Sequence, residues 1–137
     1  MAESEKITIN MNPVELGTVD LLVEQGFYSN RTDFIRTAIR NLLGSHADEV
    51  KQAISRKSFA VGIVGFGRAE LEAARDEGRM VDIKVLGLAC IHNDVSPELA
   101  RETIQSLDVS GGVRAPRSVL DALADRMGRN GFFRRAS

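Results

Sequence analysis

The chain has 137 residues, of which 43% are hydrophobic and 27% charged, and its formal net charge is -1. This balance argues against a protein that coats nucleic acid non-specifically, because such proteins are commonly basic throughout. The single cysteine, Cys90, excludes an internal disulfide framework and suits a reducing compartment. We find neither an apolar run of 18 residues nor a charged-then-apolar leader, so we expect no membrane span, no secretory signal and a cytoplasmic protein.

The first predicted element is a strand over residues 6–11, where apolar and polar side chains alternate strictly. Its apolar face consists of Ile7, Ile9 and Met11, and its polar face of Lys6, Thr8 and Asn10. A lone strand has two unpaired edges, and antiparallel pairing with its own copy across a two-fold axis satisfies one of them. The sequence therefore predicts a two-stranded ribbon with one polar face.

Two helices follow the predicted strand. Asn12 is placed as an N-cap, with Pro13 at the first helical position, and Gly26 stops the first helix. Ser29 is the predicted N-cap of the second helix, which Gly44 ends. The second helix has a wide apolar stripe made of Phe34, Ile35, Ala38, Ile39, Leu42 and Leu43. Roughly 40 residues are too few for an independent core, so we predict an obligate dimer.

A ribbon of this kind fits the major groove of B-DNA. Lys6, Thr8 and Asn10 can hydrogen-bond to base edges, although a solvated polar strand face would have the same pattern. The start of the second helix offers free N–H groups and a cation to a phosphate, from Ser29, Asn30, Arg31 and Thr32. The alternative for Arg31 is a surface pair with Asp33.

Residues 6–43 resemble the ribbon-helix-helix transcription regulators of the CopG, Arc and MetJ types. The run Gly26-Phe27-Tyr28-Ser29-Asn30-Arg31-Thr32-Asp33-Phe34-Ile35-Arg36-Thr37-Ala38-Ile39-Arg40 is similar to the turn and second helix of CopG-like members. The resemblance implies that Lys6, Thr8 and Asn10 read bases and that the start of the second helix, near Ser29, Asn30 and Arg31, grips the DNA backbone. It covers about a third of the chain.

The rest of the chain predicts a helical connector and then three strand-then-helix passages. The expected strands are residues 59–65, 81–92 and 107–115, and the expected helices are 48–56, 68–75, 97–104 and 116–127. Strand positions recur at about 24 residues, so that Phe59, Ile83 and Leu107 align, as do Val61, Val85 and Val109, and Gly87 with Gly111. This spacing is typical of small α/β solenoids, although one ordinary α/β layer would also allow it. Free strand edges would join dimers into tetramers or larger assemblies.

No group of residues predicts catalysis or a cofactor, so we expect a non-enzyme. Cys90 and His92 share a strand face, and the resembled family includes a nickel-responsive repressor, but a structural role is favoured over a metal site. Gly62, Gly65 and Gly67 lack the spacing of a phosphate-binding loop and are interpreted as packing and turn positions.

We therefore predict a mixed α/β protein in four parts: a ribbon-helix-helix DNA-binding and dimerisation domain (1–45), a helical connector (46–57), an α/β repeat-like domain for oligomerisation or regulation (58–127) and a basic tail (128–137). The expected function is a bacterial, nucleoid-associated, sequence-specific regulator, acting as a repressor on a double-stranded DNA operator. Two alternatives stay open. One is an antitoxin whose C-terminal part binds a toxin, and the other is an architectural protein that polymerises along DNA.

Overall fold

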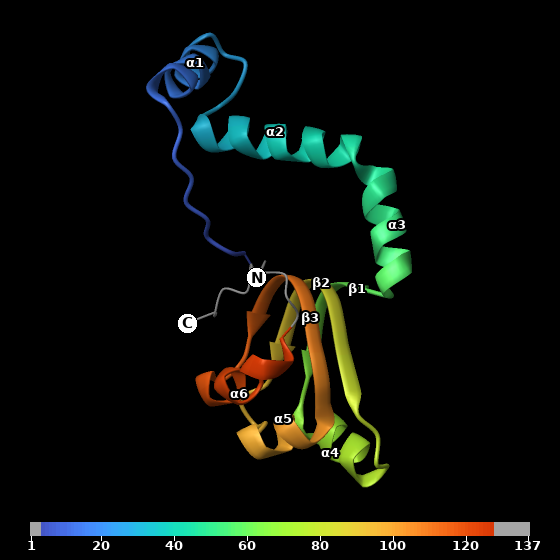
Figure 1. Cartoon of the computed structure of the whole chain (residues 1–137). Helices are drawn as coiled ribbons and strands as arrows, with labels where there is room; N and C mark the ends of the chain where they lie inside the picture. Colours follow the sequence, from blue (N-terminus) through green and yellow to red (C-terminus); the bar gives the residue numbers. More distant parts are fainter. Residues whose placement is uncertain (1–3, 128–137) are drawn as a thin grey trace. The chain divides into compact units, whose positions relative to one another are not determined.

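The computed structural model describes residues 4–127, so the predicted basic tail at 128–137 lies outside the described residues. Contacts between residues divide the chain after Gln52 into an N-terminal unit and a C-terminal unit. The N-terminal unit holds α1 (Pro13–Glu24), α2 (Arg31–Ser45) and the first half of α3 (Ala47–Lys57), as Figure 1 shows. The C-terminal unit holds a three-stranded parallel sheet and further helices, so the protein is of mixed α/β class.

The caps of α1 form as the sequence predicts. The side chain of Asn12 accepts a hydrogen bond of 2.8 Å from the backbone N–H of Glu15, and Pro13 is the first helical residue. After the helix, Gly26 takes a left-handed backbone with φ of +87°, which side chains with a Cβ rarely adopt. Both ends of α1 are thus set by local sequence.

The two predicted ends of α2 are each displaced by one residue. Its N-cap is Asn30 and not Ser29, because the Asn30 side chain accepts the Asp33 N–H at 2.8 Å. Its predicted stop at Gly44 is wrong, because α2 continues to Ser45 and Gly44 is not among the glycines with positive φ. Glycine tolerates a helical backbone at a cost of about 1 kcal/mol, which the longer helix offsets. Helix α3 then begins at Ala47, within one residue of the prediction.

The predicted strand over residues 6–11 is absent from the single chain, where these residues have no regular secondary structure. A strand is defined by hydrogen bonds to a neighbouring strand, and the described strands β1, β2 and β3 all belong to the C-terminal unit. The prediction requires a second copy, and one chain cannot supply it.

The C-terminal unit consists of three strand-then-helix passages, as predicted. Their elements are β1 (Ala60–Phe66), α4 (Arg68–Asp76), β2 (Val81–Ile91), α5 (Pro97–Thr103), β3 (Ile104–Arg114), α6 (Arg117–Ala122) and a 3-10 helix (Ala124–Arg126). Two predicted bounds are wrong: β3 begins three residues earlier than expected, and the last helix is shorter. The chain leaves α6 because Arg126 donates to the backbone carbonyl of Ile104 at 2.7 Å, which holds the 3-10 turn against the start of β3.

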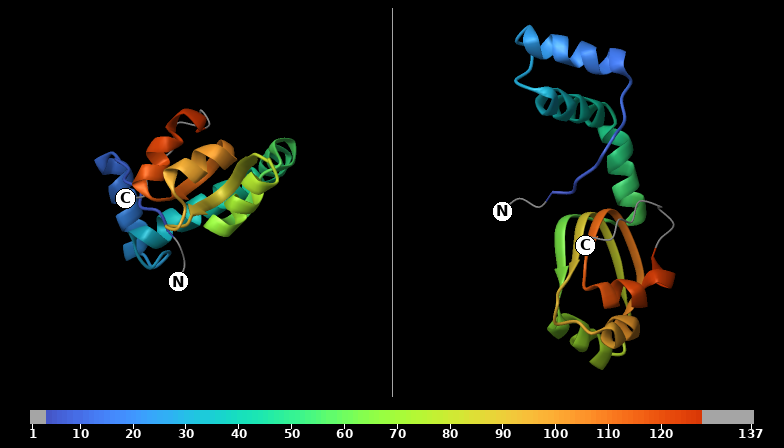
Figure 2. Two further views of the ribbon diagram at one scale, coloured as in Figure 1. Left: turned by 90° about the horizontal axis from the view of Figure 1, so that it is seen from below. Right: turned by 90° about the vertical axis from the view of Figure 1, so that its left-hand side faces the viewer.

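Each strand bends at a glycine. The bends of β2 and β3 lie at one end of the unit and the helices at the other, so β2 and β3 each rise, turn over and return, whereas β1 begins beside its bend and follows only the second arm of β2 (Figures 1 and 2). At the bends Gly62, Gly87 and Gly111 have φ of +121°, +137° and +127°. The three glycines lie opposite one another in the parallel register. We call a bent strand an arch, and one arch with the helix that follows it a repeat.

Adjacent arches approach most closely at these glycines. A Cβ built on Gly87 would lie 2.1 Å from the carbonyl oxygen of Gly62, and one on Gly111 would lie 2.0 Å from that of Gly87. No side chain fits in so small a gap, so glycine at these two positions is required both by the backbone conformation and by the neighbouring carbonyl.

The predicted 24-residue period holds between β2 and β3, where Ile83 pairs with Leu107 and Val85 with Val109. Between β1 and β2 it fails by one residue, because Val61 pairs with Leu86. The inward side chains of both arms and one face of each helix form a continuous core. This core contains Leu71, Ile83, Val85, Ala89, Ile91, Val95, Leu99, Ala100, Ile104, Leu107, Val109, Val113, Val119, Leu120 and Leu123.

Side-chain bonds add to the core at the end nearest β3. Thr103 is fully buried, and its hydroxyl donates to the Leu99 carbonyl at 2.7 Å. Arg101 binds Asp125 at 3.1 Å, and this hydrogen bond holds the pKa of the Asp125 carboxyl below its ordinary value. The chain then passes beside β3, where Met127 forms an isolated parallel bridge with Leu107. Among residues 4–127, the helices are all too short or too polar to cross a bilayer.

Candidate DNA-binding surface

The N-terminal unit leaves its apolar side chains uncovered. In its described residues Val19 is the one buried hydrophobic side chain, at 4% exposure, whereas Ile7 and Ile9 are 63% and 59% exposed. Other exposed apolar side chains lie on the two helices and on the turn between them: Val14, Leu21, Phe27, Ile39, Leu42 and Leu43. Soluble proteins rarely expose so many large apolar groups, so this surface is a candidate for contact with another molecule.

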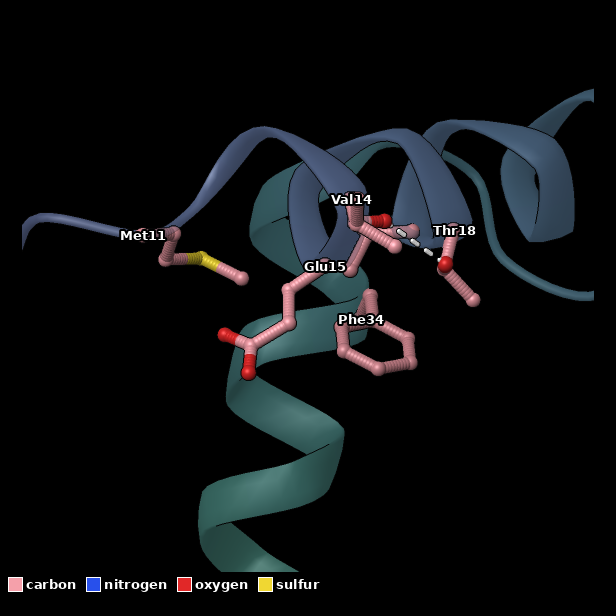
Figure 3. Close-up of a pocket in the computed structure, with 6 residues that line it drawn as sticks. Met11, Val14, Glu15, Thr18 and Phe34 are labelled. Atoms are coloured by element: carbon pink, nitrogen blue, oxygen red, sulfur yellow. Dashed lines mark hydrogen bonds between the residues drawn. The ribbon is translucent and has the colours of Figure 1, made fainter.

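An open hollow lies between the two helices on this uncovered side. It has a volume of about 350 Å³, and Met11, Val14, Glu15, Thr18, Val19 and Phe34 line it. Figure 3 shows Phe34 reaching from α2 toward Val14 and Thr18 on α1. Phe34 also meets Tyr28 edge to face, with 5.0 Å between the ring centroids. The hollow has the size and apolar lining to accept side chains of a second copy.

The three predicted base-reading residues are all exposed. Lys6, Thr8 and Asn10 precede the N-cap of α1 in the segment without regular structure. Ile7 and Ile9, which alternate with these residues along the chain, are exposed as well. The single chain therefore buries neither the predicted base-reading residues nor these two isoleucines.

Local hydrogen bonds organise the start of α2. Asn30 caps the Asp33 N–H, and the Asp33 carboxylate in return accepts the backbone N–H of Ser29 at 2.9 Å. Within residues 4–127, the backbone N–H groups of Arg31 and Thr32 have no hydrogen-bond acceptor. These two N–H groups at the positive end of the helix dipole remain available to an anion.

The guanidinium of Arg31 is bound to an acid that sequence reasoning missed. It donates two hydrogen bonds to Asp20 of α1, at 2.7 and 2.8 Å, in a bidentate pair. These bonds lower the pKa of Asp20 and raise the pKa of Arg31, so the pair stays ionised at neutral pH. The two residues are 11 apart in sequence and meet because the Gly26 turn folds α2 back on α1, a contact that helical spacing alone does not reveal.

Two further arginines lie exposed on α2. Arg36 and Arg40 are one helical turn apart and so share one side of the helix. Neither forms an ion pair with any residue in 4–127. They offset in part the negative charges of Asp20 and Asp33 near the start of the helix.

Cys90 and His92 do not form part of a metal cluster in the described chain. Across residues 4–127 no three His, Cys, Asp or Glu side chains gather as a metal ion would require. The imidazole of His92 instead covers β1, where a Cβ on Gly65 would lie 2.9 Å from Nε2 and one on Gly67 would lie 3.1 Å from Nδ1. These two glycines therefore make room for a ring, which agrees with the predicted packing role.

Comparisons with known proteins identify a family. The Ribbon-Helix-Helix transcriptional regulator family matches residues 2–120. The transcriptional regulator CdrS of Halobacterium salinarum is 31% identical over 45 residues, which cover 33% of this chain and 82% of that protein. No solved structure matches the chain significantly. Because the family match extends over most of the sequence, the chain belongs to the Ribbon-Helix-Helix family of transcriptional regulators, which bind DNA as dimers.

Proposed function

We propose that the protein is a sequence-specific repressor that reads the major groove with an antiparallel ribbon formed by residues 6–11 of two chains. In this arrangement Ile7, Ile9 and Met11 turn into the dimer core, and Lys6, Thr8 and Asn10 face the bases. The start of α2 then contacts the phosphates that flank the groove.

The observation that carries the proposal is the uncovered apolar surface of the N-terminal unit. Burying one large apolar side chain is worth about 1.5–3 kcal/mol. Ile7, Ile9 and the exposed residues of α1 and α2, counted over two chains, therefore provide enough free energy to exceed the roughly 4–15 kcal/mol cost of association. Dimerisation that buries the apolar face of residues 6–11 leaves the polar face outward, since side chains alternate along a strand.

The direct test is selection of binding sites from a random DNA pool with the purified full-length protein. We expect enrichment of one short motif in two copies related by symmetry or by a repeat, because a two-fold ribbon reads two half-sites. Recovery of unrelated sequences with equal affinity would contradict specific recognition and would favour the architectural alternative.

Asp20→Asn should strengthen DNA binding. The substitution releases Arg31 for a phosphate and removes a negative charge beside it. We expect affinity for operator and for unrelated DNA to rise together by about 3- to 10-fold, and the slope of log K against log salt to steepen by about one unit.

Arg31→Ala should lower the affinity for all DNA and reduce the slope of log K against log salt. Gel-shift titrations over a range of salt concentrations measure both, and Asp48→Asn on α3 is the control that removes one acid elsewhere.

If Asp20→Asn weakens binding to every DNA, Asp20 holds Arg31 in its productive position and does not compete with phosphate. Loss of fold is not expected to confuse the result, because an exposed ion pair contributes little to stability.

We also propose that the C-terminal units join dimers into tetramers, so that two dimers bind adjacent half-sites and gain affinity by avidity. The antitoxin alternative has no specific observation in its favour. The C-terminal unit has a buried core of its own, whereas toxin-binding tails of the resembled family are short and disordered before binding.

A further inference from the structure

The parallel sheet of the C-terminal unit has one open edge, at β1. Among residues 4–127, β1 pairs with β2 alone, so the backbone groups on its other side have no strand beside them. The opposite edge differs, because Met127 bridges Leu107 beside the first arm of β3. One edge is therefore partly covered and the other is free.

The open edge is apolar and carries no feature that discourages pairing. Val61 and Ile63 are 64% and 63% exposed, and they lie beside Leu86 and Leu88 of β2 in the register. The seven residues of β1 include no charged residue and no proline. Free edges in soluble proteins are usually protected by lysine, proline or a bulge, so an edge without them is expected to be covered.

The bend at Gly62 provides a second and independent sign of a missing neighbour. Gly62 has the same left-handed backbone as Gly87 and Gly111, with φ of +121°. A Cβ at Gly87 or Gly111 meets the carbonyl of the preceding arch, whereas a Cβ at Gly62 has no atom within 4 Å. The backbone at Gly62 is thus exposed to close approach by another strand.

We propose that β1 of one chain pairs with β1 of a second copy, the two strands running antiparallel about a two-fold axis. A second copy is the occupant favoured here because β1 is apolar and uncharged along its whole length and is therefore complementary to the same strand of another chain. Pairing of β1 with β3 of another chain would instead require the edge beside which Met127 lies, and would give an open-ended filament. Contact through two identical edges closes on itself.

This inference deepens the proposed assembly of dimers through the C-terminal unit and rests on that part of the proposed function. It specifies that Val61 and Ile63 of both chains pack together across the axis, on the face they share with Leu86. It requires no particular placement of the N-terminal unit.

Cysteine cross-linking of the full-length protein without DNA tests the contact. With Val61 and Ile63 packed together across the axis, Val61 of one chain faces Ile63 of the other. In a Cys90→Ser background, we therefore expect the double variant Val61→Cys/Ile63→Cys to give disulfides between chains on mild oxidation, because facing residues in antiparallel strands lie about 4.5–5.5 Å apart. Gln105→Cys is the matched control, because Gln105 is exposed on the strand at the opposite edge. Non-reducing electrophoresis at high dilution measures the linked fraction. Absence of linkage in the Val61→Cys/Ile63→Cys variant, or equal linkage at Gln105, would overturn the proposal.

A second measurement separates this contact from DNA binding. Ile63→Lys adds a charge at an exposed position, so the thermal unfolding of the chain should be unchanged while its mass by light scattering falls from tetramer to dimer. An unchanged mass of the Ile63→Lys variant would contradict β1 pairing as the contact that joins dimers. A wild-type mass of a dimer with β1 cross-links would instead keep the pairing and reject only the tetramer. Neither the cross-linked fraction nor the mass by light scattering depends on DNA, so failure of the operator selection would not change either result.

Discussion

Replacing Gly87 by alanine is expected to unfold the C-terminal unit while leaving the helices of the N-terminal unit in place. The new Cβ would lie 2.1 Å from the Gly62 carbonyl oxygen, and backbone atoms on both sides leave no flexible group to move away. The substitution also forces alanine into a φ of +137°. We expect a loss of more than about 4 kcal/mol in the free energy of unfolding of the unit, measured by denaturant titration followed by circular dichroism.

Gly62→Ala is the matched control because it shares the backbone conformation but lacks the close carbonyl. Its φ is +121° and no atom lies within 4 Å of its Cβ position. Backbone strain alone should cost about 1–3 kcal/mol. Equal losses in the free energy of unfolding for the Gly62→Ala and Gly87→Ala variants would show that backbone strain dominates. The close approach of neighbouring arches would then contribute little.

Lys6→Ala and Asn10→Ala are each expected to reduce affinity for the selected operator far more than affinity for unrelated DNA. A side chain that makes a good pair of hydrogen bonds to a base edge contributes about 1–3 kcal/mol of discrimination, or roughly 5- to 150-fold. Asn10 should show this most clearly, since an amide has no net charge to lose. Lys6→Ala should in addition lower the salt slope where its ammonium lies near phosphates. Competition gel shifts with operator and scrambled duplexes provide the ratio.

Lys51→Ala on α3 is the control for loss of a positive charge at an exposed helix position. It should leave the ratio of specific to non-specific affinity unchanged. If the Lys6 and Asn10 variants retain wild-type operator affinity, the ribbon does not read the bases, and recognition must be sought on α2, where Arg36 and Arg40 are exposed.

Local signals in the sequence predicted both ends of α1 and the N-cap of α5, although both predicted ends of α2 were one residue off. Asn12, Gly26 and Ser96 stand where the cap chemistry of their side chain or backbone places them, and Ser96 accepts the Leu99 N–H at 3.1 Å. The parallel strands and the alignment of Gly87 with Gly111 were also predicted, since both depend on a repeat that the sequence displays. Helix caps depend only on residues close together in sequence, and the alignment of the strands depends only on the repeat period.

Features that depend on distant or separate groups were not predictable in the same way. The pairing of Arg31 with Asp20 requires the angle at which α1 and α2 meet, and the sequence suggested only Asp33 as a partner. The bend of each strand at a glycine was missed, because a glycine within an apolar run is equally compatible with a straight buried strand. The predicted ribbon cannot be tested in a single chain, since its hydrogen bonds would join two chains.

The glycine bends have a consequence for how this unit can change in evolution. Each strand-and-helix repeat contacts only the repeat before it and the repeat after it, so the stability of the unit is nearly a sum of terms between neighbours. A duplicated repeat of 24 or 25 residues could be inserted between β1 and β3 with its glycine aligned, and the result would be a longer stack with the same two ends. Relatives that differ in length by whole repeats, and keep one glycine per repeat, are therefore compatible with an unchanged N-terminal unit.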